Sequence, residues 1–259
     1  METSLFCGGF APRGATMSHD DPWRFSLALV MPVHNEEACI GEVIRSWRDE
    51  FSRLGISFQM IVLNDGSKDG TAEQLEAFRD DERIEIVNKP NSGHGPTILR
   101  GYRLAVERAP WVFQTDSDNE MKPVHFRELW ERREEYDALF GFRQNRTQTL
   151  DRKFISAVSA WTVRLFFGSG VRDVNTPYRL MRSPLLARII EQIPDDALTP
   201  NILISGALAR AGLRILNHPV PHEGRKTGKA SIVKWGLWKF AFRAFWQCLQ
   251  CRPCLETEQ

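Results

Sequence analysis

Three carboxylates stand at alternate positions directly after an apolar run in the middle of the chain. The run covers residues 111–115, and the acids are Asp116, Asp118 and Glu120. Alternate side chains of an extended segment point to the same side, so we expect these three to converge. A hard cation such as Mg²⁺ or Mn²⁺ relieves their repulsion and keeps open positions for substrate phosphates. The spacing favours an enzyme that handles a phosphorylated substrate; a solvated loop or a helix cap is the alternative.

Apolar runs alternate with helical patterns through the first half of the chain. Strands are predicted for residues 27–33, 58–63, 84–87, 111–115 and 138–142. Helices are predicted between them for residues 40–51, 71–79, 96–106 and 123–135, with Pro96 opening the third. Repeated alternation of this kind predicts an α/β fold with a mostly parallel sheet covered by helices on both faces.

Polar clusters fall at the carboxyl ends of three predicted strands. They are His34-Asn35-Glu36, Asn64-Asp65 and Asp116-Ser117-Asp118. Ligands of open α/β sheets bind beyond these strand ends, so the three clusters are expected on one rim. Three clusters on one rim are harder to explain as coincidence than a single acidic motif.

The second half of the chain has a different pattern. Helices are predicted for residues 153–167 and 201–211, a polar loop or edge strand for 173–182, and an extended segment for 213–220. Residues 24–231 are predicted to form one domain, because no internal repeat or low-complexity linker divides them. Residues 1–23 contain no convincing signal-peptide core and are predicted to be a mobile tail.

Composition excludes several classes of protein. The net charge of the 259 residues is +1, which gives no reason to expect a nucleic-acid partner. Five cysteines are an odd number without framework spacing, so a reducing compartment is expected. No run of about 20 uninterrupted apolar residues is present, so no membrane-spanning helix is predicted.

Residues 232–259 form an aromatic and basic C-terminal segment. Polar residues recur in it about every four positions, at Lys234, Lys239, Arg243 and Gln247. This spacing predicts an amphipathic helix that docks at a membrane interface; an ordinary helix packed on the core is the alternative. Cys248, Cys251 and Cys254 are interpreted as inert thiols, since three thiols without a fourth ligand are a weak metal signal.

Four motifs in order resemble the family 2 inverting glycosyltransferases of the GT-A fold. They read Pro-Val-His-Asn-Glu-Glu from residue 32, Asn-Asp-Gly-Ser-Lys-Asp-Gly-Thr from 64, Asn-Ser-Gly-His-Gly from 91, and Asp-Ser-Asp from 116. The resemblance covers most of the chain. Later motifs, around residues 140–143, 173–179 and 222–229, resemble the branch that includes dolichol-phosphate mannose synthase and polyprenyl-phosphate glycosyltransferases.

The resemblance implies a nucleotide-sugar site and an acceptor-facing C-terminal half. The donor-binding positions that it implies are Pro32, His34, Glu36, Leu63, Asp65, Thr115, Asp116, Ser117 and Lys229. It also implies a metal at Asp116, Asp118 and Glu120, and phosphate contacts from Arg143 and Arg225. Two positions depart from the family pattern. Asn64 stands where the family usually has Asp, and Lys229 lies two positions before the usual closing lysine.

The expected chemistry is displacement of a nucleoside diphosphate from a sugar. Asp118, with the metal, and the arginines Arg143 and Arg225 would offset the charge that develops on the leaving diphosphate. Arg152 and Arg179 are candidate clamps for an anionic acceptor. Asp173 would bind a sugar hydroxyl, or act as base if the acceptor is an alcohol. A salt bridge from Asp173 to Arg179 or Arg172 is the structural alternative.

The sequence therefore predicts a Mg²⁺- or Mn²⁺-dependent glycosyltransferase that transfers a sugar from a nucleotide-diphosphate sugar to a polyprenyl phosphate or related lipid. We expect it in the cytoplasm, peripheral on the cytoplasmic face of a membrane. A soluble or glycan hydroxyl acceptor is one alternative, and a non-catalytic nucleotide-sugar-binding protein is another.

Overall fold

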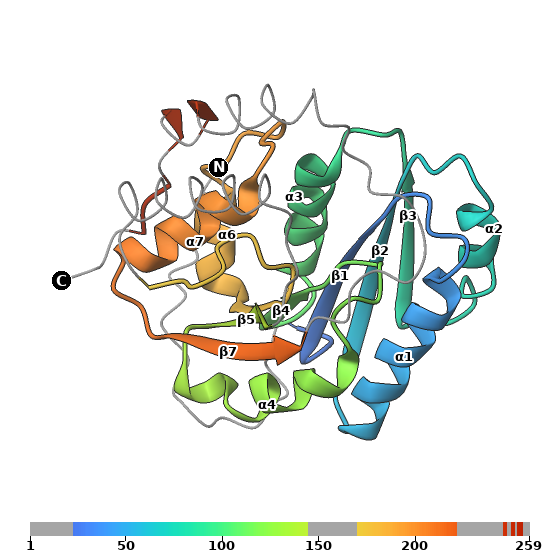
Figure 1. Ribbon diagram of the computed structural model, residues 1–259, viewed down its shortest axis with the longest axis horizontal. Helices are drawn as coiled ribbons and strands as arrows, with labels where there is room; N and C mark the ends of the chain where they lie inside the picture. Colours follow the sequence, from blue (N-terminus) through green and yellow to red (C-terminus); the bar gives the residue numbers. More distant parts are fainter. Residues whose placement is uncertain (1–22, 145–169, 222–245, 248–249, 252, 256–259) are drawn as a thin grey trace, which may run out of the picture.

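The computed structural model describes residues 23–144, 170–221, 246–247, 250–251 and 253–255. In this part of the chain, seven strands form one sheet in the order β3-β2-β1-β4-β6-β5-β7 (Figure 1). They are β1 (Leu27–Val33), β2 (Phe58–Asp65), β3 (Ile84–Lys89), β4 (Trp111–Gln114), β5 (Ala138–Gln144), β6 (Arg179–Arg182) and β7 (Ile215–Pro221). Only β6 among these strands runs antiparallel to its neighbours, so the predicted mostly parallel sheet is confirmed.

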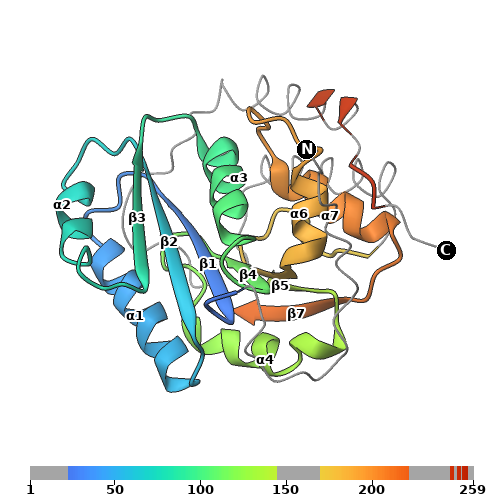
Figure 2. The ribbon, with the colours of Figure 1, turned by 180° about the vertical axis from the view of Figure 1, so that it is seen from behind.

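Helices cover both faces of the sheet (Figures 1 and 2). One face carries α1 (Ile40–Arg53), α2 (Thr71–Glu76) and α4 (Phe126–Glu131), with the short helices η1 (Pro123–His125) and η2 (Arg133–Glu135) beside α4. The other carries α3 (His94–Ala105), α6 (Ser183–Ile190) and α7 (Pro200–Arg210).

Alternation along the strands separates two hydrophobic cores. In β1, Leu27, Leu29 and Met31 face α1, whereas Ala28 and Val30 face α3. Every residue of this strand is buried, which is why it reads as a continuous apolar run. Aromatic rings form the centre of the core on the α1 face. The ring centroid of Trp47 lies 5.2 Å from that of Phe113 and 5.9 Å from that of Tyr178. These cores hold the carboxyl ends of β1, β2 and β4 side by side.

The structure departs from the predictions in three places. Residues 173–182 were expected as a loop or edge strand, but β6 lies inside the sheet between β4 and β5. The sequence pattern does not identify β6 as a central strand, because the buried Arg179 interrupts the run of apolar residues that such a strand usually has. Helix α6 was not predicted, although Ser183 and Pro184 at its start are a helix-opening signal. Helix α3 begins at His94, two residues before Pro96.

Several predictions fall outside the described residues. They concern the helix at 153–167, most of the tail at 1–23 and most of the C-terminal segment. Trp23, the last residue of the predicted tail, is described, and its indole N–H donates to the carbonyl of Val106 at 3.3 Å. Within the described residues, no helix has the length and apolar character needed to cross a membrane.

Candidate active site

A cleft of about 400 Å³ opens at the carboxyl ends of β1, β2 and β4. Seven of the predicted site residues line it: Pro32, His34, Glu36, Asp65, Asp116, Ser117 and Asp118. The first half of α3 contributes the opposite wall through Gly93, His94 and Thr97, joined by Asn91 from the preceding loop. The three polar strand ends therefore meet on one rim, as their positions after the strands predicted.

The loop after β1 is fixed to the loop after β2. Asn35 has a positive φ of 55°, and its backbone N–H donates to Ser67 Oγ at 3.0 Å. In return, the backbone N–H of Lys68 donates to Asn35 Oδ1 at 2.8 Å. The N–H of Glu36 donates to Thr71 Oγ1 at 2.8 Å. These bonds hold the His34-Asn35-Glu36 segment rigidly at the cleft edge.

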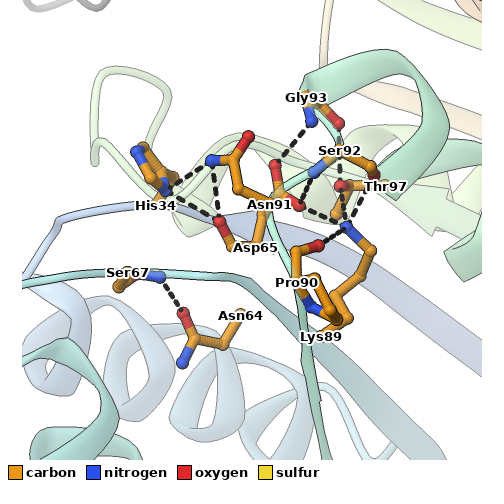
Figure 3. A network of polar contacts seen from close by, with 10 residues as sticks. All are labelled: His34, Asn64, Asp65, Ser67, Lys89, Pro90, Asn91, Ser92, Gly93 and Thr97. Atoms are coloured by element: carbon orange, nitrogen blue, oxygen red, sulfur yellow. Dashed lines mark hydrogen bonds and ion pairs between the residues drawn. The ribbon is translucent and has the colours of Figure 1, made fainter.

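Asp65, at the end of β2, is the centre of a buried network (Figure 3). Its carboxylate accepts hydrogen bonds from the backbone N–H groups of Ser92, at 2.8 Å, and Gly93, at 3.0 Å. It also accepts from the ammonium of Lys89, its register partner on β3. Lys89 donates further to Ser92 Oγ at 2.7 Å and Thr97 Oγ1 at 3.1 Å. The network ties β2, β3 and the start of α3 together under the cleft.

Charge keeps the Asp65 carboxylate ionised despite its burial. Burial alone would raise the pKa of this carboxyl, but the hydrogen bonds from Lys89 and the Ser92 N–H outweigh it and lower the pKa below 3.8. Lys89 was not among the predicted site residues. The signal available in the sequence was only that a lysine closely follows the strand predicted at 84–87; its register opposite Asp65 is seen in the structure alone.

Asn91 and His34 lie next to each other at the same rim (Figure 3). The side-chain amide of Asn91 donates to the Asp65 carbonyl at 3.0 Å. His34 Nδ1 lies 2.9 Å from this carbonyl, and Nε2 lies 3.1 Å from Asn35 Nδ2. The tautomer that donates from Nδ1 to the Asp65 carbonyl and accepts at Nε2 from the Asn35 amide satisfies both contacts.

The acidic segment after β4 is a turn rather than an extended strand. Strand β4 ends at Gln114, Asn119 has a positive φ of 59°, and the N–H of Glu120 donates to Asp118 Oδ1 at 3.1 Å. The expectation that alternation along an extended chain aligns the three acids is therefore wrong. The turn instead brings all three to one cavity.

A second, much smaller cavity of about 20 Å³ adjoins the cleft, with which it shares Asp116 and Asp118. It is lined by Thr115, Asp116, Asp118, Glu120, Met121, Arg143 and Pro177. Among the described side chains, no three acidic, histidine or cysteine groups are gathered closely enough to hold a metal ion. The predicted three-carboxylate ligand set is thus not assembled in this structure. Oxygen ligands suited to Mg²⁺ or Mn²⁺ nevertheless share the cavity wall, and Mg²⁺ commonly takes only one or two carboxylates together with phosphates.

Arg143 and Asp173 form a two-point ion pair beside this cavity. Arg143 Nε donates to one carboxylate oxygen of Asp173 at 2.8 Å, and Nη2 donates to the other at 3.1 Å. Burial would lower the pKa of the Arg143 guanidinium, but the bonds and charge of Asp173 raise it. The structural alternative for Asp173 was an ion pair with Arg179 or Arg172; the partner is Arg143 instead.

Arg179 cannot act as the predicted acceptor clamp, because its side chain is fully buried. Its guanidinium donates to the backbone carbonyls of Thr176, Asn201 and Val174 at 3.0–3.1 Å. Leu63 is also fully buried, so its side chain does not reach the base-binding surface that was expected to include it. The predicted residues Arg152, Arg225 and Lys229 lie outside the described part of the chain.

The site therefore combines a polar cleft with a carboxylate-rich and arginine-containing cavity at one end. The cleft has room for a nucleoside, and the adjoining cavity offers oxygen ligands and a cation for a charged group such as a diphosphate. A reaction at the junction would take place close to Asp116 and Asp118, which line both spaces.

Comparison with known families agrees with this geometry. The profile of glycosyl transferase family 2 matches residues 28–183, more than half of the chain. The matched segment contains all three strand-end clusters and β6.

Curated relatives carry related descriptions. The chain is 27% identical over 168 residues to an undecaprenyl-phosphate 4-deoxy-4-formamido-L-arabinose transferase of Pseudomonas paraeruginosa, covering 63% of this chain and 49% of the relative. It is 27% identical over 225 residues to an uncharacterized glycosyltransferase of Synechocystis, covering 83% of this chain and 67% of the relative. The chain thus spans about half to two thirds of the length of these relatives.

Solved structures share the fold. Glucosyl-3-phosphoglycerate synthase from Mycobacterium tuberculosis, in complex with Mn²⁺, UDP and glucosyl-3-phosphoglycerate, superposes with a TM-score of 0.65 at 17% identity. The alignment covers 90% of this chain and 82% of the synthase. The predicted GT-A fold class and the resemblance to family 2 are both confirmed.

Proposed function

The chain belongs to glycosyl transferase family 2, and from this premise we propose that it transfers a sugar from a nucleotide-diphosphate sugar to a polyprenyl phosphate, with the help of a divalent metal. The observation that carries the proposal is the junction of the polar cleft with the cavity of Asp116, Asp118 and Arg143. The names of the relatives, which include undecaprenyl-phosphate transferases, support the acceptor class.

The donor is assigned to the cleft. His34, Glu36 and Asp65 would surround the nucleoside, together with Asn91 and Thr97. The diphosphate would then extend to Asp116 and Asp118 at the junction. Because the loops that carry these side chains are cross-linked to each other, the donor site is largely preformed.

A divalent ion fits the oxygen donors at the junction. Asp116 and Asp118 would hold it together with oxygens of the diphosphate, and Glu120 would act through water. The ion would supply positive charge to the departing diphosphate. Arg143, which lines the same cavity, would add a fixed cation on the other side.

The ion pair of Asp173 favours an acceptor that is already anionic. Both carboxylate oxygens of Asp173 accept hydrogen bonds from Arg143, so the group is engaged in holding the arginine and is not directed at an acceptor hydroxyl. A phosphate acceptor needs no base: one of its oxygens forms the new bond to the anomeric carbon as the bond to the donor phosphate breaks. The electron pair leaves with the nucleoside diphosphate, and no proton has to move.

A paired assay tests this function. The purified chain, with Mn²⁺ or Mg²⁺, is incubated with a panel of UDP- and GDP-sugars and a short-chain polyprenyl phosphate, and the glycolipid is detected by mass spectrometry. The matching polyprenyl alcohol is the control acceptor. Product with the phosphate alone supports the proposal; no product from any donor contradicts it.

A hydroxyl acceptor is the second candidate, and Asp173 separates the two. If Asp173 is a general base, Asp173→Asn lowers kcat at every acceptor concentration and removes the acidic limb of the pH profile. If it positions Arg143 toward the donor diphosphate, the same variant chiefly raises KM for the nucleotide sugar and the limb remains. We expect the second result.

We also propose that residues 232–259 bring the site to a membrane surface, which would place the protein peripherally on the cytoplasmic face. The support is the spacing of basic and aromatic residues in this segment. A lipid acceptor gives such docking a purpose, since the phosphate to be glycosylated stays at the interface.

A further inference from the structure

Arg179 is a fully buried cation whose nearby partners are all neutral. Its three nitrogens donate to the backbone carbonyls of Thr176, Asn201 and Val174 and approach Ser205 Oγ at 3.5 Å. The ring of Phe140 lies 4.9 Å from its guanidinium carbon. Among the described residues, no carboxylate lies within ion-pair distance of this guanidinium, whereas Arg143 has Asp173.

The position of Arg179 places this charge directly behind the active site. In the sheet it stands opposite Gln114 of β4 and opposite Phe140 of β5. Asp116 follows two residues after Gln114, and Arg143 follows three residues after Phe140. The buried cation therefore lies between the two strand ends that supply the cavity.

A buried polar network connects this region to Asp116. Tyr102 donates to Gln114 Oε1 at 2.8 Å, and the amide of Asn201 donates to the same oxygen at 2.9 Å. The amide nitrogen of Gln114 lies 3.5 Å from Asp116 Oδ1. Asn201 is also the residue whose carbonyl accepts from Arg179. Gln114, Asn201 and Tyr102 are each at most 3% exposed, so water does not screen them.

Burial without a carboxylate is unfavourable for a cation, yet an arginine stays protonated under such conditions. Burial lowers the pKa of the Arg179 guanidinium, while Tyr102 and the charges of Asp173 and Asp116 oppose that shift. Its positive potential is thus felt at both carboxylates although it touches neither. In a desolvated site such a potential is strong.

We propose that Arg179 is a positioning residue for the donor diphosphate: its buried charge makes the cavity favourable for added negative charge, and its hydrogen-bonded frame fixes Gln114 beside Asp116. The inference rests on the proposed function, because it assumes that a diphosphate binds at the junction. The sequence predicted that Arg179 contacts the acceptor directly. In the structure, Arg179 would instead affect the donor diphosphate through its buried charge and its hydrogen bonds.

A purely structural role is the competing explanation, since Arg179 also ties the segment before β6 to α7. The two roles differ in what they do to ligands of different charge. If Arg179 only holds the two segments together, its loss lowers the affinity for a nucleoside and for the nucleoside diphosphate by the same factor. If its buried charge attracts the diphosphate, loss of that charge lowers the affinity for the diphosphate and leaves the affinity for the uncharged nucleoside almost unchanged.

Two pairs of variants make this distinction. Ser205→Asp places a carboxylate beside Arg179 and neutralises its field while keeping the arginine; Ser205→Asn has the same size and no charge. Arg179→Met removes the cation, and Arg179→Lys keeps it. Arg182→Met is the control for a lost cation: Arg182 lies at the other end of β6, over the ring of Trp111.

The measurement is calorimetric titration with UDP, GDP, uridine and guanosine, with Mn²⁺ and again in EDTA. Ser205→Asp is expected to bind the preferred diphosphate about tenfold more weakly than Ser205→Asn. The reason is that the new carboxylate offsets the attraction between the Arg179 charge and the diphosphate in a poorly solvated site. Both should bind the nucleoside equally. Arg179→Met should match Ser205→Asp, Arg179→Lys should recover most of the affinity, and Arg182→Met should resemble wild type.

Equal diphosphate affinity in Ser205→Asp and Ser205→Asn overturns the inference and leaves the proposed function intact. So does a loss that is equal for nucleoside and diphosphate. If Arg179→Met does not fold, the Ser205 pair still decides, because both of its members retain Arg179. A wild-type chain that binds neither UDP nor GDP overturns the proposed function and this inference with it.

Discussion

Carboxylates of the site divide into two kinds at the scale of single residues. Asp65 and Asp173 each accept several charge-assisted or backbone hydrogen bonds from neighbouring residues. Asp116 and Asp118 instead line both the cleft and the adjoining cavity. The first pair fixes loops and an arginine in place, and the second pair lines the junction at which we propose that the reaction takes place.

Asp118→Asn tests the second kind. Loss of one anionic oxygen at the junction is expected to lower transfer by about 100-fold or more, the usual scale for a transition-state contact. Mn²⁺-dependent tightening of UDP or GDP binding should weaken in parallel, as measured by calorimetry. Asp80→Asn, on the exposed surface after α2, is the matched control and should behave as wild type. Full activity of Asp118→Asn with a chelator present would rule out the metal role.

Asp65 gives a prediction about pH. Its pKa in the folded chain lies below 3.8, so its stabilising contribution is complete above that pH and is lost as pH falls through the folded value. The free energy of unfolding of the wild type should therefore fall more steeply than that of Asp65→Asn as the pH is lowered below about 4. Urea denaturation across this range measures both slopes. Parallel curves would contradict the assignment.

The residues that sequence reasoning located well are those whose position follows from strand ends. His34, Asp65 and Asp116 come directly after apolar runs, and the topology of parallel sheets brings them together. Arg179 was misplaced, because an arginine in a polar-looking segment gives no sign that its backbone pairs on both sides. Lys89 was missed because its role depends on the register between β2 and β3, which periodicity does not specify.

At the scale of elements, the start of α3 is held against the loop before α7. A Cβ added to Gly95 would lie 2.3 Å from the carbonyl oxygen of Ala197 and 2.4 Å from that of Leu198. Both atoms belong to the backbone and cannot move aside without shifting the loop. The close approach sets where Gly93 and His94 line the cleft.

Gly95→Ala is therefore expected to lower the free energy of unfolding by about 1–3 kcal/mol, as for other overpacked sites. Donor affinity should fall as well, since the cleft wall must move. Gly41→Ala, inside α1, is the control: its nearest neighbour would be the flexible end of Arg45 at 3.4 Å, so alanine should stabilise that helix by up to about 1 kcal/mol. Urea midpoints of the two variants that shift in the same direction would refute this account.

Elements of the first half could be predicted more fully than those of the second. Strands β1 to β4 are short apolar runs between helices of clear periodicity, so local pattern and final structure agree. Strand β6 has only four residues and takes its place from pairing with β4 and β5, two strands that lie well before it in the chain. Such non-local pairing leaves little trace in the local pattern.

At the scale of the whole molecule, the site lies on one rim of the sheet, and a lipid acceptor requires that rim to be near a membrane. Replacing Lys234, Lys239 and Arg243 by Gln should weaken binding to vesicles rich in anionic lipid by up to about 100-fold, since each basic residue contributes about 1 kcal/mol near such a surface. Sedimentation with vesicles measures the partition. The control replaces Arg45, Arg48 and Arg53 of α1 by Gln; equal loss in both triples would show non-specific attraction only.

The position of β6 between β4 and β5 also affects how long the growing chain exposes unpaired strand edges during synthesis. During synthesis, β3, β2, β1 and β4 can pair as soon as residue 114 has emerged, but β4 then presents an open edge. Strand β5 follows from residue 138 but does not close that edge, because its neighbours in the sheet are β6 and β7. Until residues 179–182 arrive, the facing edges of β4 and β5 remain available to other chains, and the outer edge of β5 stays open until β7 has formed at residues 215–221. Conditions that stall translation in this interval should therefore yield aggregates, whereas a pause after residue 221 should yield far fewer.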